Sequence, residues 1–393
     1  MARKRRVLRV GPIRLRLTRA GWLFLLVSVL VGVASAKNHE SPLVFVLFGV
    51  MMGSLMVSIT LAGRTIAGVR VVRSAPERVW QGQVANVGYY LRNRRRGGAC
   101  LALSLHEAPA DGADSVGGYC VHLAAQNTFR AAGRIMPMNR GRLKLTRIDL
   151  ETTFPFGLVR ASRRIRQAAS MVVWPARGLL RQRLLHRGAV ETSSAPPSQV
   201  SGGQDEFFGL REYRPGDNPR WIHWRRSATR DAPVVREMAR PRPDTLWVIV
   251  DTHWPEASEE GNALRERALR FAATLIDHAF VRGCQVGLAV ASGHGPFVRA
   301  PRPGRGQRSA LLDALSDVPL NTTVTLEAVL AGLGPRHFDR SQAIVVTPRA
   351  HLPGADLRNV RRACRHLTVI GSDRMARAFQ DCTPDLEEIV PCR

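Results

Sequence analysis

Two long runs without charge dominate the first sixty residues of the chain. Residues 20–36 read AGWLFLLVSVLVGVASA and residues 42–62 read PLVFVLFGVMMGSLMVSITLA. Each approaches the ~20 apolar residues that a helix needs to cross a bilayer. The connecting KNHES is short enough that only a tight helical hairpin fits. The pattern predicts a two-helix transmembrane hairpin over residues 20–62, preceded by a basic arm at residues 1–19.

Basic residues flank this hairpin on its two outer sides. Eight of them lie in residues 1–19 with no acid, and four arginines (Arg64, Arg70, Arg73 and Arg78) follow the second run. Because Lys and Arg collect on the cytoplasmic side of spanning helices, we expect both termini to be cytoplasmic. The expected location is the inner (cytoplasmic) membrane, with the chain crossing it more than once.

Two other interpretations of the apolar runs stay open. Ala34-Ser35-Ala36 resembles a signal-peptidase site after a short apolar run. Two core helices of a soluble protein are the other alternative. We favour the hairpin, because a second apolar run follows at once and thirty-eight uncharged residues are hard to bury in a soluble core.

After the hairpin, apolar and polar positions alternate with a period of two residues. Residues 64–180 contain short runs of Val, Leu, Ile and aromatic residues, separated by Gly, Pro, Asn and Asp clusters. Residues 141–152, GRLKLTRIDLET, alternate apolar and polar positions along their whole length. This pattern is typical of antiparallel strands and predicts a small β-sandwich. The polar, Ser- and Pro-rich residues 181–204 are expected to form a linker.

Buried strands and amphipathic helices alternate in the last part of the chain, residues 244–393. Strands are expected at 244–251, 284–292, 342–348 and 366–371, and helices at 262–283, 305–316, 323–332 and 355–364. Such alternation predicts a mostly parallel sheet with helices on both faces, in the doubly wound manner of a Rossmann-like domain.

The positive charge is concentrated near the predicted membrane segment. The net charge is +27; residues 64–200 hold 22 basic and seven acidic residues, whereas residues 244–393 hold 18 and 17. A nucleic-acid reader would concentrate the excess in its binding domain. Basic residues beside a bilayer instead favour contact with anionic lipid. We therefore expect a lipid bilayer, and no nucleic acid, among the partners.

The six cysteines form no CxxC pair and no metal-ligand spacing. We expect reduced thiols, as in other cytosolic domains. A Cys100–Cys120 bridge within the β-domain is the main alternative.

The segment at residues 205–243 contains the densest candidate site. Within it, GLREYRPGDNPRWIHWRRSA (209–228) combines a Pro-Gly turn, two acids, two tryptophans and five arginines. Asn218 with Pro219 fits the start of a helix that continues through WIHWRRSAT. We interpret this turn and helix as a buckle in which the tryptophans wedge between the two domains, or as a surface that binds a partner. The candidate residues are Arg211, Tyr213, Gly216, Asp217, Arg220, Trp221 and Trp224.

The same stretch resembles the bacterial domain-of-unknown-function family 58. The family pattern, Leu-Arg-x-Tyr-x-x-Gly-Asp-x-x-Arg-x-Ile-x-Trp-x-x-Ser-Ala, is matched at ten positions, and a hydrophobic strand ending in Asp251 follows. The Phe-Pro-Phe-Gly-Leu run at 154–158 is similar to the family's Asp-Pro-Phe-Gly-Leu, with Phe154 in place of the acid. The resemblance implies paired N-terminal spans, a β-rich region and a von Willebrand factor type A-like domain.

The resemblance implies no catalysis and no cofactor, but it implies a partner. Members are often encoded beside AAA+ ATPases of the MoxR type. Type A domains commonly bind a metal through Asp-x-Ser-x-Ser after the first strand, and here that stretch reads Asp251-Thr252-His253-Trp254-Pro255. Both serine positions differ, so we expect a degenerate motif that holds no metal.

Together these patterns predict an α+β multidomain chain. We expect a transmembrane helical hairpin, a β-sandwich domain and a C-terminal α/β type A-like (Rossmann-like) domain. The expected function is a non-enzymatic, membrane-anchored scaffold or adaptor for a protein partner, such as an AAA+ ATPase. The alternative is an accessory subunit of a membrane-associated enzyme with an unrecognised active site, although the sequence lacks the common catalytic motifs.

Overall fold

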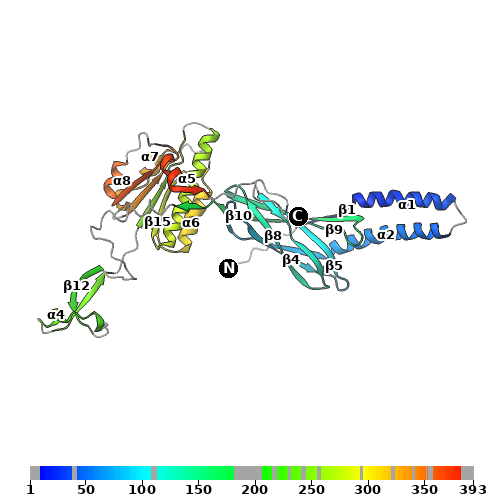
Figure 1. The fold of residues 1–393 in the computed structure, drawn as a ribbon, viewed down its shortest axis with the longest axis horizontal. Helices are drawn as coiled ribbons and strands as arrows, with labels where there is room; N and C mark the ends of the chain where they lie inside the picture. The colour runs from blue at the N-terminus through cyan, green and yellow to red at the C-terminus, as the bar shows by residue number, and fades with distance from the viewer. Residues whose placement is uncertain are drawn as a thin grey trace.

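The described elements of the chain form an extended arrangement with a helical hairpin at one end and an α/β domain at the other (Figure 1). The predicted linker at 181–204, together with Gly216 and Asp217 of the predicted site, lies outside the described residues. The computed structural model describes residues 9–37, 42–107, 113–180, 206–214, 219–228, 232–239, 245–254, 258–292, 295–319, 324–338, 341–350, 352 and 357–381.

Two antiparallel helices form the N-terminal hairpin. Helix α1 (Arg19–Lys37) and helix α2 (Pro42–Ala67) are both long and apolar enough to cross a membrane. Their large apolar side chains point outward, with Trp22, Leu30 and Phe45 each more than half exposed. The helices approach each other where Gly32 lies against the ring of Phe48.

The predicted basic arm is in part a strand. Residues Arg9–Leu17 form β1, which pairs antiparallel with β10 (Val159–Trp174). Ile13, Leu15 and Leu17 alternate with arginines, which is the period of a strand. The prediction of an arm over residues 1–19 overlooked this alternation within the charge run.

Two antiparallel sheets make up the β-domain. The first runs β1-β10-β9-β5-β7, with β3 (Arg78–Trp80) parallel to the end of β10. The second runs β2-β4-β8-β6. The remaining strands of the two sheets are β9 (Gly141–Thr152), β5 (Cys100–Glu107), β7 (Tyr119–Leu123), β2 (Val69–Ser74), β4 (Ala85–Asn93), β8 (Thr128–Pro137) and β6 (Ala113–Val116).

Apolar side chains from both sheets share one core. In β2 the buried positions alternate strictly with exposed ones, so Val69 and Val71 face the core. Leu103, Leu150 and Ile165 reach the same core from the other sheet. Cys100 and Cys120 lie on neighbouring strands and are buried as free thiols. Cys382 and Cys392 lie outside the described residues.

One ion pair is enclosed by this core. Arg73 contacts Glu107 at 2.7 Å, and their side chains are 0% and 2% exposed. Tyr89 donates its hydroxyl hydrogen bond to Glu107 at 3.1 Å, and Arg73 donates to the Leu145 carbonyl at 2.9 Å. Burial raises the pKa of the Glu107 carboxyl, and the Arg73 charge opposes that rise. The pair thus costs desolvation free energy that its hydrogen bonds must offset.

The C-terminal domain is a mixed sheet with helices on both faces. The strand order is β16-β15-β14-β17-β18, parallel except for the edge strand β16. The strands are β14 (Thr245–Val250), β15 (Gln285–Ser292), β16 (Gly295–Arg302), β17 (Gln342–Val346) and β18 (His366–Ile370). The helices are α5 (Glu259–Val281), α6 (Arg305–Ser316), α7 (Leu326–Ala331), α8 (Arg358–Ala363) and α9 (Ser372–Ala378).

Strand β14 shows why both faces are covered. Leu246, Val248 and Val250 lie in the core under α5, α6 and α9, whereas Trp247 and Ile249 lie in the core under α7 and α8. Successive side chains of a strand point to opposite faces, so a strand buried on both sides reads as continuously apolar.

Two additions extend the predicted pattern. β16 was missed because Pro296 and Pro301 interrupt its sequence, which an edge strand tolerates. A short strand after the β-domain, β11 (Gly178–Leu180), pairs with β19 (Phe379–Asp381) near the end of the described chain. The β-domain and the α/β domain therefore share a two-stranded sheet.

We expect Glu107→Ala to lower the free energy of unfolding by about 3–5 kcal/mol, because it leaves the Arg73 guanidinium buried without its carboxylate. Denaturant unfolding of the full-length protein in detergent measures the loss. The double variant Arg73→Met/Glu107→Leu is the control and should recover most of the stability. A loss below about 1 kcal/mol in Glu107→Ala would contradict a buried pair.

Candidate functional site

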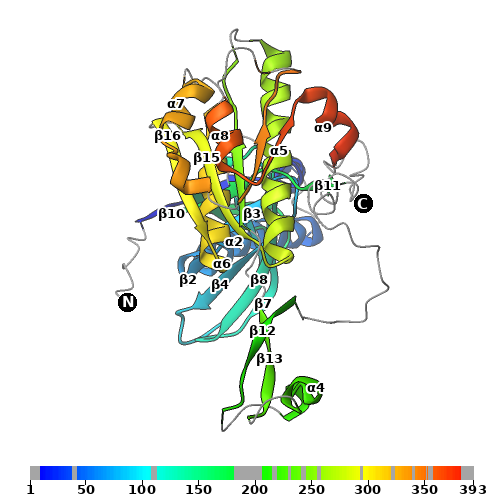
Figure 2. The same cartoon turned by 90° about the vertical axis from the view of Figure 1, so that its left-hand side faces the viewer.

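The predicted site lies on a small unit that stands apart from the two domains in Figure 1 and projects below them in Figure 2. Strands β12 (Glu206–Glu212) and β13 (Val234–Ala239) pair as an antiparallel hairpin. Between them lie a 3₁₀ turn, η1 (Pro219–Trp221), and a one-turn helix, α4 (Trp224–Ser227). These described residues between 206 and 239 are called the arm from here on; they are distinct from the basic segment at residues 1–19.

Hydrogen bonds to β13 hold the turn and the helix in place. The backbone N–H of His223 donates to the Val234 carbonyl at 2.8 Å. The Val234 N–H donates in turn to Ser227 Oγ at 2.9 Å. Ile222 forms a single bridge with Val235, and both valines are about 1% exposed. Two adjacent side chains of β13 are therefore buried where the turn and the helix meet this strand.

His223 has a local structural role. Its Nδ1 accepts a hydrogen bond from the Arg226 backbone N–H at 3.3 Å and so caps α4. Ser227 Oγ also donates to the His223 carbonyl at 3.1 Å. Side chains that satisfy the free N–H groups of a first helical turn are a common way to start a helix.

The predicted continuous helix from Asn218 through residue 229 is wrong. The chain makes a 3₁₀ turn, then bonds to β13 at Ile222 and His223, and only then begins α4. Each backbone N–H donates one principal hydrogen bond, so the N–H of His223 that pairs with β13 cannot also extend a helix from Pro219.

The arm presents part of the candidate set to solvent. Trp224 is 68% exposed and Tyr213 is 36% exposed, while Arg220 is also exposed. Trp224 is therefore not wedged between the domains as the buckle hypothesis required. The structure describes the backbone but not the side chains of Arg211 and Trp221, and Gly216 and Asp217 lie outside it. It thus brings Tyr213, Arg220 and Trp224 onto one small unit.

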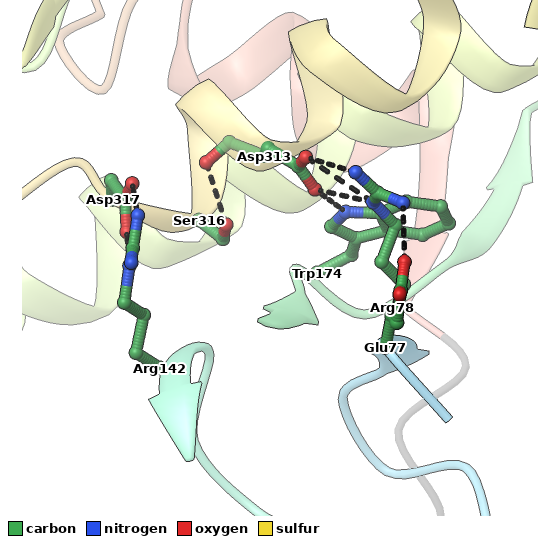
Figure 3. Close-up of polar contacts among 7 residues, drawn as sticks. All are labelled: Glu77, Arg78, Arg142, Trp174, Asp313, Ser316 and Asp317. Carbon is green, nitrogen blue, oxygen red and sulfur yellow. Dashed lines mark hydrogen bonds and ion pairs between the residues drawn. The ribbon is translucent and has the colours of Figure 1, made fainter. Parts of the chain in front are cut away.

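A different pair of tryptophans joins the domains. Trp80 and Trp174 are 5% and 6% exposed and belong to the core of the α/β domain, although both come from β-domain strands. Their rings meet edge to face at 5.0 Å between centroids. Trp174 Nε1 donates to Asp313 of α6 at 2.8 Å, and Arg78 Nη2 contacts the same carboxylate at 2.9 Å (Figure 3).

Further ion pairs surround this joint. Arg142 of β9 reaches Asp317 at 3.4 Å (Figure 3), and Arg140 pairs with Glu266 of α5. The Arg177 guanidinium stacks over the Trp80 ring at 4.1 Å from its centroid. In each charge pair the arginine belongs to the β-domain and the acid to the α/β domain. Neither tryptophan was among the predicted site residues, because the pairing of β3 with β10 that brings Trp80 to Trp174 is not visible in the sequence.

Asp251, the acid of the degenerate metal motif, directly follows the central strand β14. Strand β14 lies between β15 and β17. The strands that follow it are added first on one side, as β15 and β16, and then on the other side, as β17 and β18, so the strand order reverses at β14. Ligands of open α/β sheets bind at the carboxyl ends of the strands at such a point. Asp251 is 3% exposed, and its Oδ2 accepts a hydrogen bond from Thr347 Oγ1 at 2.9 Å.

The residues around Asp251 do not fit a divalent metal. Its Oδ1 accepts from the His253 backbone N–H at 3.0 Å, so both carboxylate oxygens are engaged within the protein. Arg349 donates to the His253 carbonyl at 3.2 Å and supplies a positive charge beside the carboxylate. In the described part of the chain, no group of three or more His, Cys, Asp or Glu side chains is placed to hold a metal ion.

Burial raises the pKa of Asp251 above its ordinary value of 3.8. The hydrogen bonds from the His253 N–H and from Thr347 oppose this rise, as does the Arg349 charge. The folded chain therefore binds the Asp251 proton more tightly than the unfolded chain does.

Fold and site together define a multidomain α+β protein in which a helical hairpin and a β-domain precede an arm and an α/β domain. Residues 209–372 match the family described as Protein of unknown function DUF58, so the chain carries a DUF58 domain over this range. The domain begins within β12 and ends in the first residue of α9. This match confirms the resemblance drawn from the sequence. A search of curated proteins found no match.

We expect Trp174→Ala to destabilise the full-length protein by about 3–5 kcal/mol, because it opens a cavity in the joint and removes the donor to Asp313. Trp224→Ala is the matched control and should change stability by less than about 0.5 kcal/mol, because that side chain is exposed. Denaturant unfolding in detergent compares the two variants. Equal losses would contradict the assignment of the joint to Trp174.

The raised pKa of Asp251 predicts a pH-dependent difference between the wild type and Asp251→Asn. The stability that Asp251 contributes is full below pH ~3.8 and is lost as the pH rises through the raised folded-state pKa. The melting temperature of Asp251→Asn minus that of the wild type should therefore increase from pH 4 to pH 7. Calorimetry at matched ionic strength measures this difference; a difference that shrinks with rising pH would show a lowered pKa instead.

Proposed function

We propose that the protein is a non-enzymatic, membrane-anchored adaptor that presents the arm and the α/β domain to a cytoplasmic protein partner. The observation that carries the proposal is the arm, which projects away from both domains (Figures 1 and 2) and on which Trp224 and Tyr213 are exposed. Trp, Tyr and Arg are enriched among the residues that dominate the energetics of protein interfaces. An exposed tryptophan on a locally ordered unit is thus well suited to insert into a pocket of another protein.

The helical hairpin supports the anchor in this proposal. Helices α1 and α2 carry outward apolar side chains over lengths sufficient to cross a bilayer. Arg14 and Arg16 of β1 and Arg19 at the start of α1 lie on one outer side of the hairpin. Arg64 in the last turn of α2 and Arg70 of β2 lie on the other. By the positive-inside rule both ends of the hairpin face the cytoplasm, and the membrane is the inner (cytoplasmic) membrane.

The strand order supports a von Willebrand factor type A-like interpretation of the α/β domain. A central first strand, an antiparallel edge strand and helices on both faces are shared with that doubly wound class. The loss of both serine positions after Asp251 is consistent with a domain that binds its partner without a metal. The proposed partner is an AAA+ ATPase of the MoxR type, on the strength of the family resemblance.

The second candidate function is an accessory subunit of a membrane-associated enzyme. Asp251 favours it, because a buried carboxyl with a raised pKa at the reversal point of an α/β sheet is a common feature of active sites. The engagement of both of its oxygens within the protein favours the adaptor instead.

Capture of partners by the full-length protein from detergent-solubilised membranes tests the adaptor. We expect an AAA+ ATPase in the eluate, and we expect Trp224→Ala to weaken its capture at least tenfold, because loss of a central interface tryptophan costs roughly 2 kcal/mol or more. Tyr119→Ala removes an exposed aromatic from the β-domain and is the matched control, with no expected effect.

The same assay separates the alternatives. Capture that is lost on nuclease treatment would indicate nucleic-acid binding and contradict the adaptor. Capture of the ATPase at wild-type level by Trp224→Ala would exclude the arm as the binding surface. Comparison with and without ATP reports whether the nucleotide state of the partner controls the contact.

A further inference from the structure

A basic cavity lies at the base of the helical hairpin. It has a volume of about 550 Å³ and lies where the chain leaves α2 at Ala67 and enters β2 at Val69. Three arginines line it: Arg70, Arg94 and Arg163. A second cavity of about 550 Å³ shares Arg70 and Arg94 and adds Arg92. No carboxylate is among the described residues that line either cavity.

Backbone hydrogen bonds hold these arginines against the end of α2. The Arg94 N–H donates to the Gly68 carbonyl at 2.9 Å, which ties the β4–β5 connection to the exit of the helix. Arg163 Nη1 donates to the Ile66 and Ala67 carbonyls, each at 3.2 Å. The last carbonyls of a helix have no partner within the helix and carry partial negative charge, so a guanidinium is well placed there.

A buried asparagine shapes the arginine-rich connection that follows β4. Asn93 is 0% exposed; its Nδ2 donates to the Gly98 carbonyl at 3.1 Å, and its Oδ1 accepts from the Arg95 N–H at 3.0 Å. These bonds fix the backbone of the segment RNRRRGG (92–98), whose first two residues end β4.

The charges of this cluster are not neutralised within the described part of the chain. Arg70 and Arg92 are directly opposite each other in the β2–β4 register, where like charges destabilise a sheet. Arg70, Arg92 and Arg94 are exposed and have no ion pair there with a carboxylate. The Nε of Arg163 is buried without a hydrogen-bond partner, and burial lowers the pKa of this guanidinium.

The position of the cavity at the end of α2 indicates which kind of anion it binds. Helix α2 has 26 residues and so extends about 39 Å, longer than the ~30 Å hydrocarbon core of a bilayer. If the hairpin spans the membrane as proposed above, the last turn of α2 lies at the depth of the lipid headgroups. Anionic headgroups give the cytoplasmic leaflet its negative surface potential.

We propose that the cavity lined by Arg70, Arg94 and Arg163 binds the phosphate of an anionic phospholipid headgroup. The proposal rests on the membrane anchor of the proposed function, and is independent of the partner of the arm. Guanidinium groups bind phosphate through paired, charge-assisted hydrogen bonds. Several guanidinium groups around one cavity favour a headgroup with a net negative charge over a zwitterionic headgroup, whose own cation they would repel.

Native mass spectrometry of the full-length protein in detergent tests the proposal, with phosphatidylglycerol and phosphatidylcholine as probes. We expect the wild type to retain phosphatidylglycerol in preference to phosphatidylcholine. Arg70→Gln/Arg94→Gln should weaken this retention at least tenfold; Arg163 is left intact because it caps α2. Equal retention of the two lipids, or unchanged retention in the double variant, would overturn the site.

The matched control is Arg134→Gln/Lys144→Gln, which removes two exposed charges from the same domain. Arg134 pairs with Asn86 near the start of β4, whereas Arg92 lies near its end, so the control residue in this sheet is about 20 Å along the strand from Arg92. We expect the control to retain lipid as the wild type does. An equal loss would show that net charge alone attracts the lipid and would overturn a specific pocket.

Two further measurements separate the sources of failure. Soluble glycerol 3-phosphate should not displace the lipid at equal concentration; displacement would assign the cavity to a free phosphate compound and overturn the lipid. Carbonate extraction of membranes should leave the full-length chain in the pellet. Release into the soluble fraction would refute the anchor, and with it the basis of this site, whereas pelleting with no lipid preference refutes the site alone.

Discussion

The contact between Trp174 and Asp313 determines how the two halves of the molecule are arranged. Trp174 ends the longest strand of the β-domain, yet its ring is buried in the core of the α/β domain, and its indole N–H donates to a carboxylate of α6. A buried indole N–H needs an acceptor, so the ring orientation and the position of α6 constrain each other. Trp80, which packs edge to face on Trp174, gives the same core a second anchor from β3.

The arginines of the β-domain are used in two different ways at its two ends. At the joint, Arg78, Arg140 and Arg142 each meet an acid of the α/β domain. At the base of the helices, Arg70, Arg92 and Arg94 have no such acid among the described residues. The basic excess of residues 64–200 is therefore divided between an internal interface and a surface that faces the proposed membrane. The net charge of residues 64–200 shows that basic residues are in excess, but it does not show which of them face the α/β domain and which face the helices.

Much of the architecture could be predicted because periodicity reports burial directly. The uncharged runs gave helices α1 and α2, and the apolar run 244–251 gave β14. The missed elements are those whose local signal is weak: β1 lies inside a charge run, and β16 contains two prolines. The candidate site was predicted less well. The sequence placed Trp224 in a helix between domains, whereas long-range bonds to β13 break that helix and leave the ring exposed. The pairing of Trp80 with Trp174 depends on β3 joining β10, which no local pattern reveals.

Strand β10 sets the distance between the helical hairpin and the α/β domain. It has 16 residues, and at about 3.3 Å per residue it covers roughly 50 Å from Val159, near the start of α1, to Trp174 at the joint. Since β10 is hydrogen-bonded to β9 along nearly its whole length, this distance is stiff. If the hairpin spans a membrane as proposed, a partner confined to the membrane surface would pass beneath the α/β domain, whereas a large assembly could engage that domain without touching lipid.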